Sequence, residues 1–221
     1  SRGLGDVYKR QLEYLKLKKK TRHWFGPIIV FILIMIAYPL TVEFLEKDLE
    51  KGFYSLLWIS ILLSMMLATE DIFLEDYNDG TLEQTIISIS SYPLLIAKKI
   101  FVYWVMIGIP IALISFLFSL SITQNLNLSL LIMPLAMICS YIFLNLFVFG
   151  SALSLNKGSV LGAIITMPLA LPVLIVLGKS IIAIQFDINY LELMLLLLGS
   201  LSIIITIVPF IASYIIKAHL E

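Results

Sequence analysis

The sequence predicts an all-α polytopic membrane protein. Of its 221 residues, 60% are hydrophobic and only 14% are charged, and the mean hydropathy is +1.02. This composition is typical of proteins that cross a membrane several times. The apolar residues gather in six runs, each near the ~20 residues that a helix needs to cross a bilayer about 30 Å thick. The runs lack strict alternation, so helices are the expected way to satisfy the backbone in lipid.

The six runs define the expected transmembrane helices. They cover residues 25–42, 53–69, 100–122, 130–155, 160–184 and 191–216. Together they form a single transmembrane domain over residues 12–221. Span two is the shortest, and we expect its helix to continue beyond the membrane to Asn78. Residues 1–11 begin without Met and fit no element, so we predict that they are a non-native leader.

Basic residues are concentrated on one side of the expected membrane. With the N-terminus in the cytosol, the outer segments hold only Lys47, Lys51 and Lys179. The inner segments then hold the stretch 16–22 and Lys98, Lys99, Lys157 and Lys217. The positive-inside rule therefore predicts that both ends of the chain lie in the cytosol. Residues 12–25 combine basic and apolar side chains, which indicates an interfacial N-terminal helix or, alternatively, a solvated positive anchor.

One polar stretch interrupts this pattern between spans two and three. It holds six of the fifteen acidic residues of the chain, namely Glu70, Asp71, Glu75, Asp76, Asp79 and Glu83. Each would cost roughly 2.5–3.5 kcal/mol at the centre of a membrane helix. The stretch is therefore expected to lie in water on the cytosolic side. We call residues 70–93 the elbow.

The elbow contains signals for a helix end and a new helix. Gly80 follows Asn78 and Asp79 and can take the left-handed conformation that ends a helix. Thr81 can cap the next helix while Gln84 reaches back to its amide. This short helix has an apolar side with Leu82 and Ile86, and Pro93 follows a second break. We expect a cytosolic surface helix.

The acidic residues of the elbow are expected to lack partners within the chain. Lys98 and Lys99, the lysines that come next, lie beyond Pro93. Carboxylates at this density repel one another, and a basic groove on another protein would remove that cost. Leu82 and Ile86 are likewise expected to be covered by protein or by lipid headgroups, and a cleft on a partner would serve this purpose.

The chain lacks the residues of an enzyme. It has no GxxxxGK[ST] loop, so it does not hydrolyse ATP itself. No Ser, His and Asp are placed for catalysis, and the one cysteine, Cys139, is expected to be a buried hydrophobe. His23 and His219 are expected at the cytosolic ends of spans one and six, where an ordinary interfacial role competes with heme ligation. No ionisable residue lies mid-span, which argues against a proton- or sodium-coupled carrier.

Two other features of the spans invite interpretation. Polar side chains within the spans are expected to form interhelical hydrogen bonds. They are Ser140, Asn145, Ser151, Thr166, Ser200, Ser202 and Thr206. Pro168 and Pro172 are four residues apart and distort the same face of span five, as a hinge or as a fixed bend.

Three strings of residues carry a family resemblance. Asp79–Gln84, followed by Pro93, resembles the loop after the second span of ABC-2-type exporter permeases. With residues 75–84, 157–161 and 167–172 taken together, the chain from residue 12 onward resembles the CcmB family of heme exporter permeases.

The resemblance implies a function and a set of partners. In that family the loop carries a coupling helix that docks on the ATPase subunit, which would give a coupling role to Glu75, Asp76, Asp79, Gly80, Thr81, Leu82, Glu83 and Gln84. The chain would be the permease subunit of an ABC transporter in the bacterial inner membrane. That transporter would deliver heme to the periplasmic side for c-type cytochrome biogenesis.

The implied partners are a CcmA-like ATPase carrying ATP and Mg, a CcmC-like heme-handling subunit, a small CcmD-like subunit and a second copy of the chain. Heme is the expected transported species, with no resident cofactor, metal or nucleic acid, and no residue is indicated as a heme contact. The alternatives are a non-transporting scaffold that transmits ATPase motion and a stand-alone secondary carrier.

Overall fold

The computed structural model describes residues 21–42, 49–88, 91–155, 159–186, 188 and 190–220. Within these residues the secondary structure is helical, and no β-strand occurs among them. The predicted leader over residues 1–11 and most of the predicted interfacial helix lie outside the described residues. The helices are α2 (Thr21–Val42), α3 (Leu49–Thr69), α4 (Leu74–Asn78), α5 (Thr81–Ser88), α6 (Tyr92–Tyr103), the π-helix η2 (Trp104–Gly108), α7 (Ile109–Thr123), α8 (Leu126–Leu153), α9 (Ser159–Gln185) and α10 (Tyr190–Leu220).

Six helical segments of the described chain are long and apolar enough to cross a membrane. This confirms the predicted all-α polytopic class. The third segment runs without interruption from Tyr92 to Thr123, through α6, η2 and α7, and so begins earlier than the predicted residue 100. Pro93 lies in its first turn, where the missing amide hydrogen costs no hydrogen bond.

The second membrane-length segment runs from Gly52 to Asn78, which agrees with the predicted continuation of span two to Asn78, but a turn divides it into α3 and α4. Helix α3 ends at Thr69, whose hydroxyl bonds back to the carbonyls of Met65 and Met66 at 3.1 and 3.0 Å. A turn over residues 70–73 then brings Ile72 and Phe73 into the core before α4 begins. Burial of these two apolar side chains in protein is favourable, and a straight helix would have lost it.

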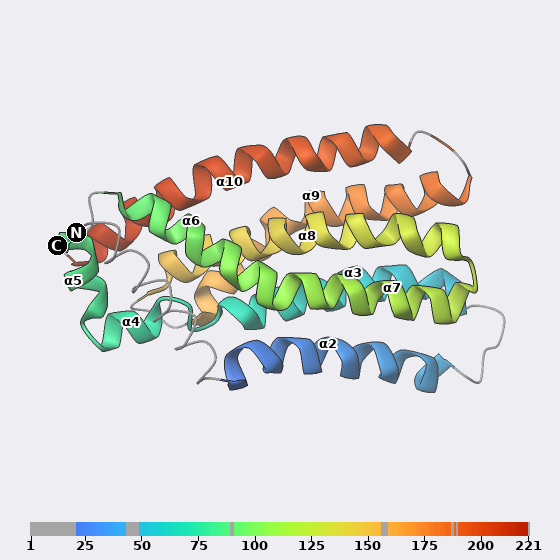
Figure 1. Ribbon diagram of the computed structural model, residues 1–221, viewed down its shortest axis with the longest axis horizontal. Coiled ribbons are helices and arrows are strands. Elements are labelled where there is room, and N and C mark those ends of the chain that lie inside the picture. The colour runs from blue at the N-terminus through green and yellow to red at the C-terminus, as the bar shows by residue number, and fades with distance from the viewer. Residues whose placement is uncertain are drawn as a thin grey trace, which may run out of the picture.

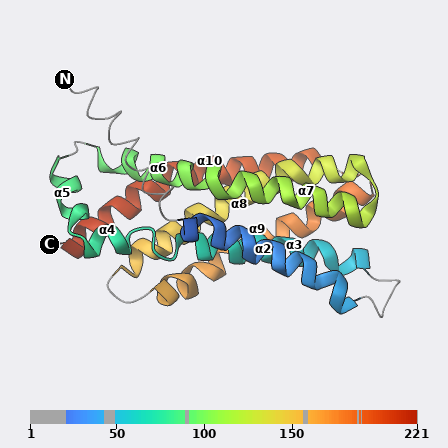
Figure 2. The ribbon, with the colours of Figure 1, turned by 60° about the horizontal axis from the view of Figure 1, so that its bottom comes forward.

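Helix α8 lies at the centre of the bundle. It packs against α3, α7, α9 and α10, while α2 packs on the other side of α3 and α7 (Figure 1, Figure 2). Most of α8 is buried, whereas most of α2 and α10 faces outward. The exposed sides of the outer helices carry Leu, Ile and Phe, which suits contact with lipid.

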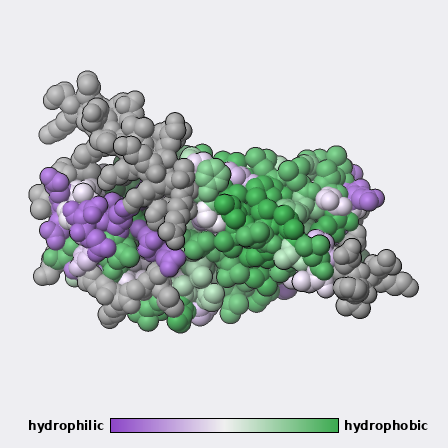
Figure 3. All heavy atoms as spheres, turned by 90° about the horizontal axis from the view of Figure 1, so that it is seen from below, coloured by the Kyte–Doolittle hydropathy of each residue, from purple (hydrophilic) through white to green (hydrophobic). Residues whose placement is uncertain are grey.

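The two ends of the bundle differ in polarity. Helices α4 and α5 and the end of α10 lie at the left end in Figure 1, and α2 begins on the same side but farther in. The turn between α7 and α8 lies at the other end. Figure 3 shows apolar surface along the body and hydrophilic surface gathered mainly at the end that holds α4 and α5. The cytosolic placement of this end remains a prediction from the basic residues.

Two glycines let α8 and α9 approach closely near that end. A Cβ added to Gly150 would lie 2.6 Å from the carbonyl oxygen of Gly162, and a Cβ on Gly162 would collide with the carbonyl of Gly150. Ser154 and Thr166 follow the two glycines by one turn and are also buried. Small residues at this spacing are typical of tight helix contacts in membranes.

A π-helix interrupts the third membrane segment at Trp104–Gly108. The indole nitrogen of Trp104 donates to the carbonyl of Met137 at 3.2 Å and to the hydroxyl of Ser140 at 3.1 Å, both on α8. A Cβ on Gly108 would collide with the indole ring, so the glycine makes room for it. The irregular turn therefore fastens this segment to the central helix.

Polar side chains within the spans donate mainly inside their own helices. Asn145, Thr166, Ser200, Ser202 and Thr206 each donate to a carbonyl three or four residues earlier. The expectation of interhelical donation is therefore wrong for these five, because a short side chain reaches the preceding turn more easily than a neighbouring helix. Interhelical bonds are formed instead by Trp104 with Ser140 and by Ser119 with Ser129, at 3.0 Å.

The two prolines of span five lie within one continuous helix. Helix α9 runs from Ser159 to Gln185 through Pro168 and Pro172. Both rings face outward on the exposed side of the helix. Their role as hinge or fixed bend stays a prediction.

Candidate functional site

The elbow turns at Gly80, as the sequence predicts. Gly80 has a φ of +67°, a conformation that costs a residue with a Cβ about 1–2 kcal/mol. Its amide donates to the carbonyl of Tyr77 at 3.2 Å, and the amide of Asp79 donates to that of Glu75 at 3.0 Å. These bonds close the end of α4 and turn the chain into α5.

The capping role predicted for Thr81 needs correction. Helix α5 begins at Thr81 itself, so this residue lies inside the helix rather than before it. Its hydroxyl donates to the carbonyl of Asp76 at 3.2 Å, which satisfies an acceptor at the end of α4. The Thr85 hydroxyl donates in turn to the Thr81 carbonyl at 2.6 Å. The hydroxyl of Thr81 thus joins the two short helices.

The apolar side of α5 is covered by the chain itself. Leu82 is only 3% exposed and belongs to the hydrophobic core, and Ile86 packs against that core. The prediction that protein covers these two residues is therefore confirmed, but the chain itself provides the cover and no cleft on a partner is needed. Ile72 and Phe73 share the same core, which the sequence could not show because helices distant in sequence supply it. Leu82 serves to hold α5 in place.

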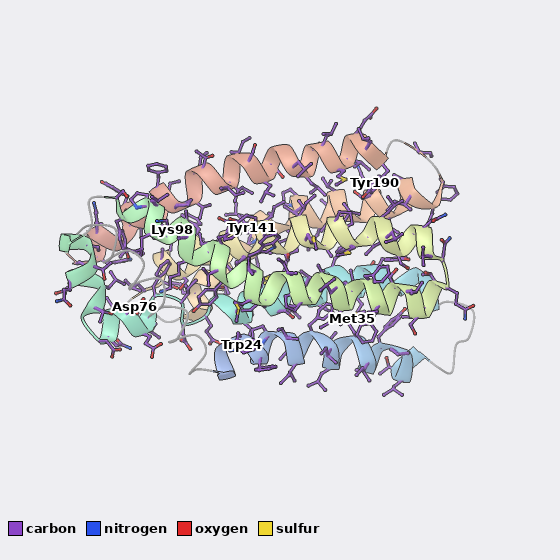
Figure 4. The ribbon with its side chains drawn as sticks, viewed as in Figure 1. Trp24, Met35, Asp76, Lys98, Tyr141 and Tyr190 are labelled. Atoms are coloured by element: carbon purple, nitrogen blue, oxygen red, sulfur yellow. The ribbon has the colours of Figure 1, made fainter. Side chains whose placement is uncertain are left out.

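Most of the acidic side chains of the elbow face outward. Glu70, Asp71, Glu75, Asp79 and Glu83 are exposed, as is Gln84. Asp76 is half-buried and lies on α4 (Figure 4). The elbow thus presents an acidic outer surface on a base that is anchored in the protein.

Asp76 has a partner within the chain that the sequence analysis missed. The ammonium nitrogen of Lys99 lies 2.7 Å from Asp76 Oδ2. The expectation that the acidic residues lack partners within the chain is therefore wrong for Asp76. Pro93 does not separate the two, because the long side chain of Lys99 on α6 reaches Asp76 on α4. A signal was present: the buried side of α6 carries Tyr92, Ile96 and Ile100, and Lys99 is three residues after Ile96.

A small cavity adjoins the elbow where α3 ends. Its volume is about 120 Å³, and it lies between α3, α8 and α9. Its lining residues are Met66, Leu67, Thr69, Glu70, Phe147, Ser151 and Ala163. The cavity is too small to enclose a porphyrin.

No metal site is found among the described residues. Groups of three or more His, Cys, Asp or Glu side chains that could hold an ion are absent from that part of the chain. His219 is partly exposed in the last turn of α10, and the side chain of His23 lies outside the described residues. Heme ligation by either histidine stays untested.

Comparisons with known proteins agree on one family. The chain matches the family described as "CcmB protein" over residues 6–219. It is 26% identical to "Heme exporter protein B" of Haemophilus influenzae over 219 residues, which cover 98% of each chain. It is 30% identical to the protein of that name from Pseudomonas aeruginosa over 152 residues, 68% of each chain. By the extent of this match, the chain belongs to the CcmB protein family.

Proposed function

We propose that this chain is the permease subunit of an ABC-type complex that exports heme across the bacterial inner membrane. Membership of the CcmB family and relatives named "Heme exporter protein B" support this function. The exported heme would serve c-type cytochrome biogenesis on the periplasmic side. A separate ATPase subunit would bind ATP and Mg and supply the energy.

The single structural observation behind this proposal is the acidic elbow. Asp79 and Glu83 flank the turn at Gly80 and face outward, while Leu82 fixes α5 to the core. A firmly anchored helix with an acidic outer face suits a partner that carries a basic groove. The proposed docking partner is the CcmA-like ATPase, and the contact surface is polar rather than apolar.

Charge reversal at the elbow tests the docking. The chain is co-expressed with the CcmA-like ATPase and purified through a tag on the chain. The variant Asp79→Lys with Glu83→Lys should lower the co-purified ATPase at least ten-fold, because like charges would then face each other. Asp79→Asn with Glu83→Gln should give an intermediate loss. Asn127→Lys, an exposed change at the other end of the bundle, is the control and should retain full binding.

A second test addresses transport itself. The chain, the ATPase and the CcmC-like and CcmD-like subunits are reconstituted in liposomes, and ATP-dependent movement of heme is measured. Gly80→Pro should abolish this movement with the chain still inserted, because proline fixes φ near −65° where the elbow needs +67°. If the unaltered complex shows no ATP-dependent movement of heme across the liposome membrane, the export function is contradicted and the scaffold role is favoured. The complex should contain two copies of the chain, which its measured mass would report.

A further inference from the structure

Lys99 binds three groups at the inner end of the bundle. Its ammonium donates to the carbonyl oxygen of Ile72 at 2.6 Å and to Asp76 Oδ2 at 2.7 Å. It also lies 5.4 Å from the centre of the Phe73 ring, within the range of a cation–π contact. Its side chain is only 15% exposed, so water competes weakly for these contacts.

The three groups belong to parts of the chain with different roles. Ile72 and Phe73 form the turn that ends α3, and Asp76 lies on α4 in the elbow. Lys99 lies on α6, at the beginning of the third membrane segment. One ammonium therefore joins two parts of the elbow, the turn after α3 and helix α4, to α6 at the start of the third segment.

The contact with the Ile72 carbonyl makes this more than a surface ion pair. A backbone carbonyl in the turn after a helix end needs a donor, and Lys99 supplies one. Exposed ion pairs contribute little because long side chains must be held in place and water screens the charges. Here the lysine is largely buried and meets a carboxylate, a carbonyl and a ring at once. These contacts fix the position of the Lys99 side chain and also compensate the charge of Asp76.

We propose that Lys99 is the positioning residue that transmits movement of the elbow to the third membrane segment. The inference rests on the proposed docking of an ATPase at the elbow. When the elbow shifts, Lys99 draws the start of α6 with it, because the ammonium holds both the turn at Ile72 and the carboxylate of Asp76. Helix α6 leads directly into η2, where Trp104 is fastened to the central helix α8, and it also packs against α10.

Lys98 offers a matched control within the same helix. It precedes Lys99, has the same charge, and is exposed on the outer side of α6 (Figure 4). Leu94 and Phe101, which are also exposed, lie on its side of the helix. A change at Lys98 removes the same charge as a change at Lys99 but leaves the contacts to Ile72, Phe73 and Asp76 intact.

The first test measures whether Lys99 fixes the elbow, without any ATPase present. Spin labels are placed at Asn78 on α4 and Leu94 on α6, both exposed, with the buried Cys139 changed to Ala. Unaltered Lys99 and Lys98→Met should give the same narrow distance distribution. Lys99→Met should at least double the width of the distance distribution. Lys99→Arg keeps charged donors, so its distribution should be nearly as narrow as that of the unaltered chain. A narrow distribution in Lys99→Met would overturn the proposal.

The second test measures transmission in the full complex. Lys99→Met should bind the ATPase within two-fold of the unaltered chain, because the acidic outer surface is unchanged, yet ATP-dependent heme movement should fall about ten-fold. Lys98→Met should retain both, and Lys99→Arg should recover much of the movement. Normal binding with normal heme movement in Lys99→Met would refute the transmitting role alone. Failure of the unaltered chain to bind the ATPase would refute the proposed function, whereas the spin-label result would still report whether Lys99 fixes the elbow.

Discussion

A substitution at Gly80 would strain the backbone but would not crowd any neighbouring atom. Its φ is positive, and a Cβ added there would meet no atom within 4 Å. A substitution therefore costs only what the left-handed backbone costs, which depends on the residue type. The run Asn78-Asp79-Gly80 predicts this left-handed conformation, because the conformation depends only on residues of the turn.

We expect Gly80→Ala to lower the free energy of unfolding by about 1 kcal/mol, because alanine is disfavoured at positive φ. Gly80→Asn should cost less than half of that, because asparagine tolerates the left-handed region better. Thermal unfolding of the purified chain in detergent measures both. Equal losses for the two variants would show that crowding, and not the backbone, decides the cost.

Leu82 and its neighbour Glu83 allow the stability contributions of the buried and exposed sides of α5 to be compared. Leu82→Ala should destabilise the protein by about 2–4 kcal/mol, because it removes a buried side chain from the core. Glu83→Ala should change stability by less than about 0.5 kcal/mol, because Glu83 is exposed. The same unfolding measurement applies. A small loss for Leu82→Ala would mean that α5 is held mainly by something other than its apolar side.

Some features of the elbow could be predicted from the sequence and others could not. Gly80 was predictable because the signal is local. The pairing of Asp76 with Lys99 was not, because it depends on where the fold places α6 relative to α4. Apolar spacing on α6 placed Lys99 near the buried side, but nothing in the sequence supplied the carboxylate or the Ile72 carbonyl as its partners.

At the scale of elements, the contact between α8 and α9 depends on two glycines. The carbonyl of Gly150 occupies the place that a Cβ on Gly162 would need, and Ser154 Oγ lies 2.6 Å from the same point. Both are held by the helix backbone or by a bond to it, since the Ser154 hydroxyl donates to the Gly150 carbonyl at 3.0 Å. Neither group can move aside without separating the helices.

We therefore expect Gly162→Ala to destabilise the protein by about 3 kcal/mol, the upper part of the usual range for overpacking. Gly178→Ala provides the control on the same helix, because a Cβ there meets nothing within 4 Å. That change should be neutral or stabilise by about 0.5–1 kcal/mol, since alanine favours helix over glycine. Similar losses for both variants would contradict the close approach of α8 and α9.

The helix boundaries show a similar division between local and distant causes. Apolar composition located all six membrane segments, because each must satisfy the same lipid environment. It did not show the turn after α3, where Ile72 and Phe73 lie within an acidic run but are buried in the protein core. The π-helix at Trp104 was also invisible, since it depends on acceptors that α8 presents.

At the scale of the whole molecule, the predicted topology can be tested with cysteines. The single native cysteine, Cys139, is buried and should stay unreactive. In intact spheroplasts, Asn127→Cys should react with a membrane-impermeant maleimide, whereas Glu83→Cys should react only after the membrane is opened. Both sites are exposed, at opposite ends of the bundle. The reverse pattern would place the elbow outside the cytosol.

The number of spans and the polar end of the molecule were predictable, because both follow from composition along the chain. The choice of α8 as the central helix was not. All six segments are strongly apolar, and hydropathy does not distinguish a helix surrounded by protein from one that faces lipid. That distinction lies in small residues such as Gly150 and in polar anchors such as Ser140, whose partners come from other helices.

The central place of α8 has a consequence for how the protein is made. The chain is synthesised in order, so the neighbours of α8 that precede it are α3, α6, η2 and α7, whereas α9 and α10 follow it. Its remaining flanks, including the bare backbone at Gly150, stay open to lipid until α9 and α10 have been synthesised. Helix α8 is therefore fully covered only after α9 and α10 have packed against it.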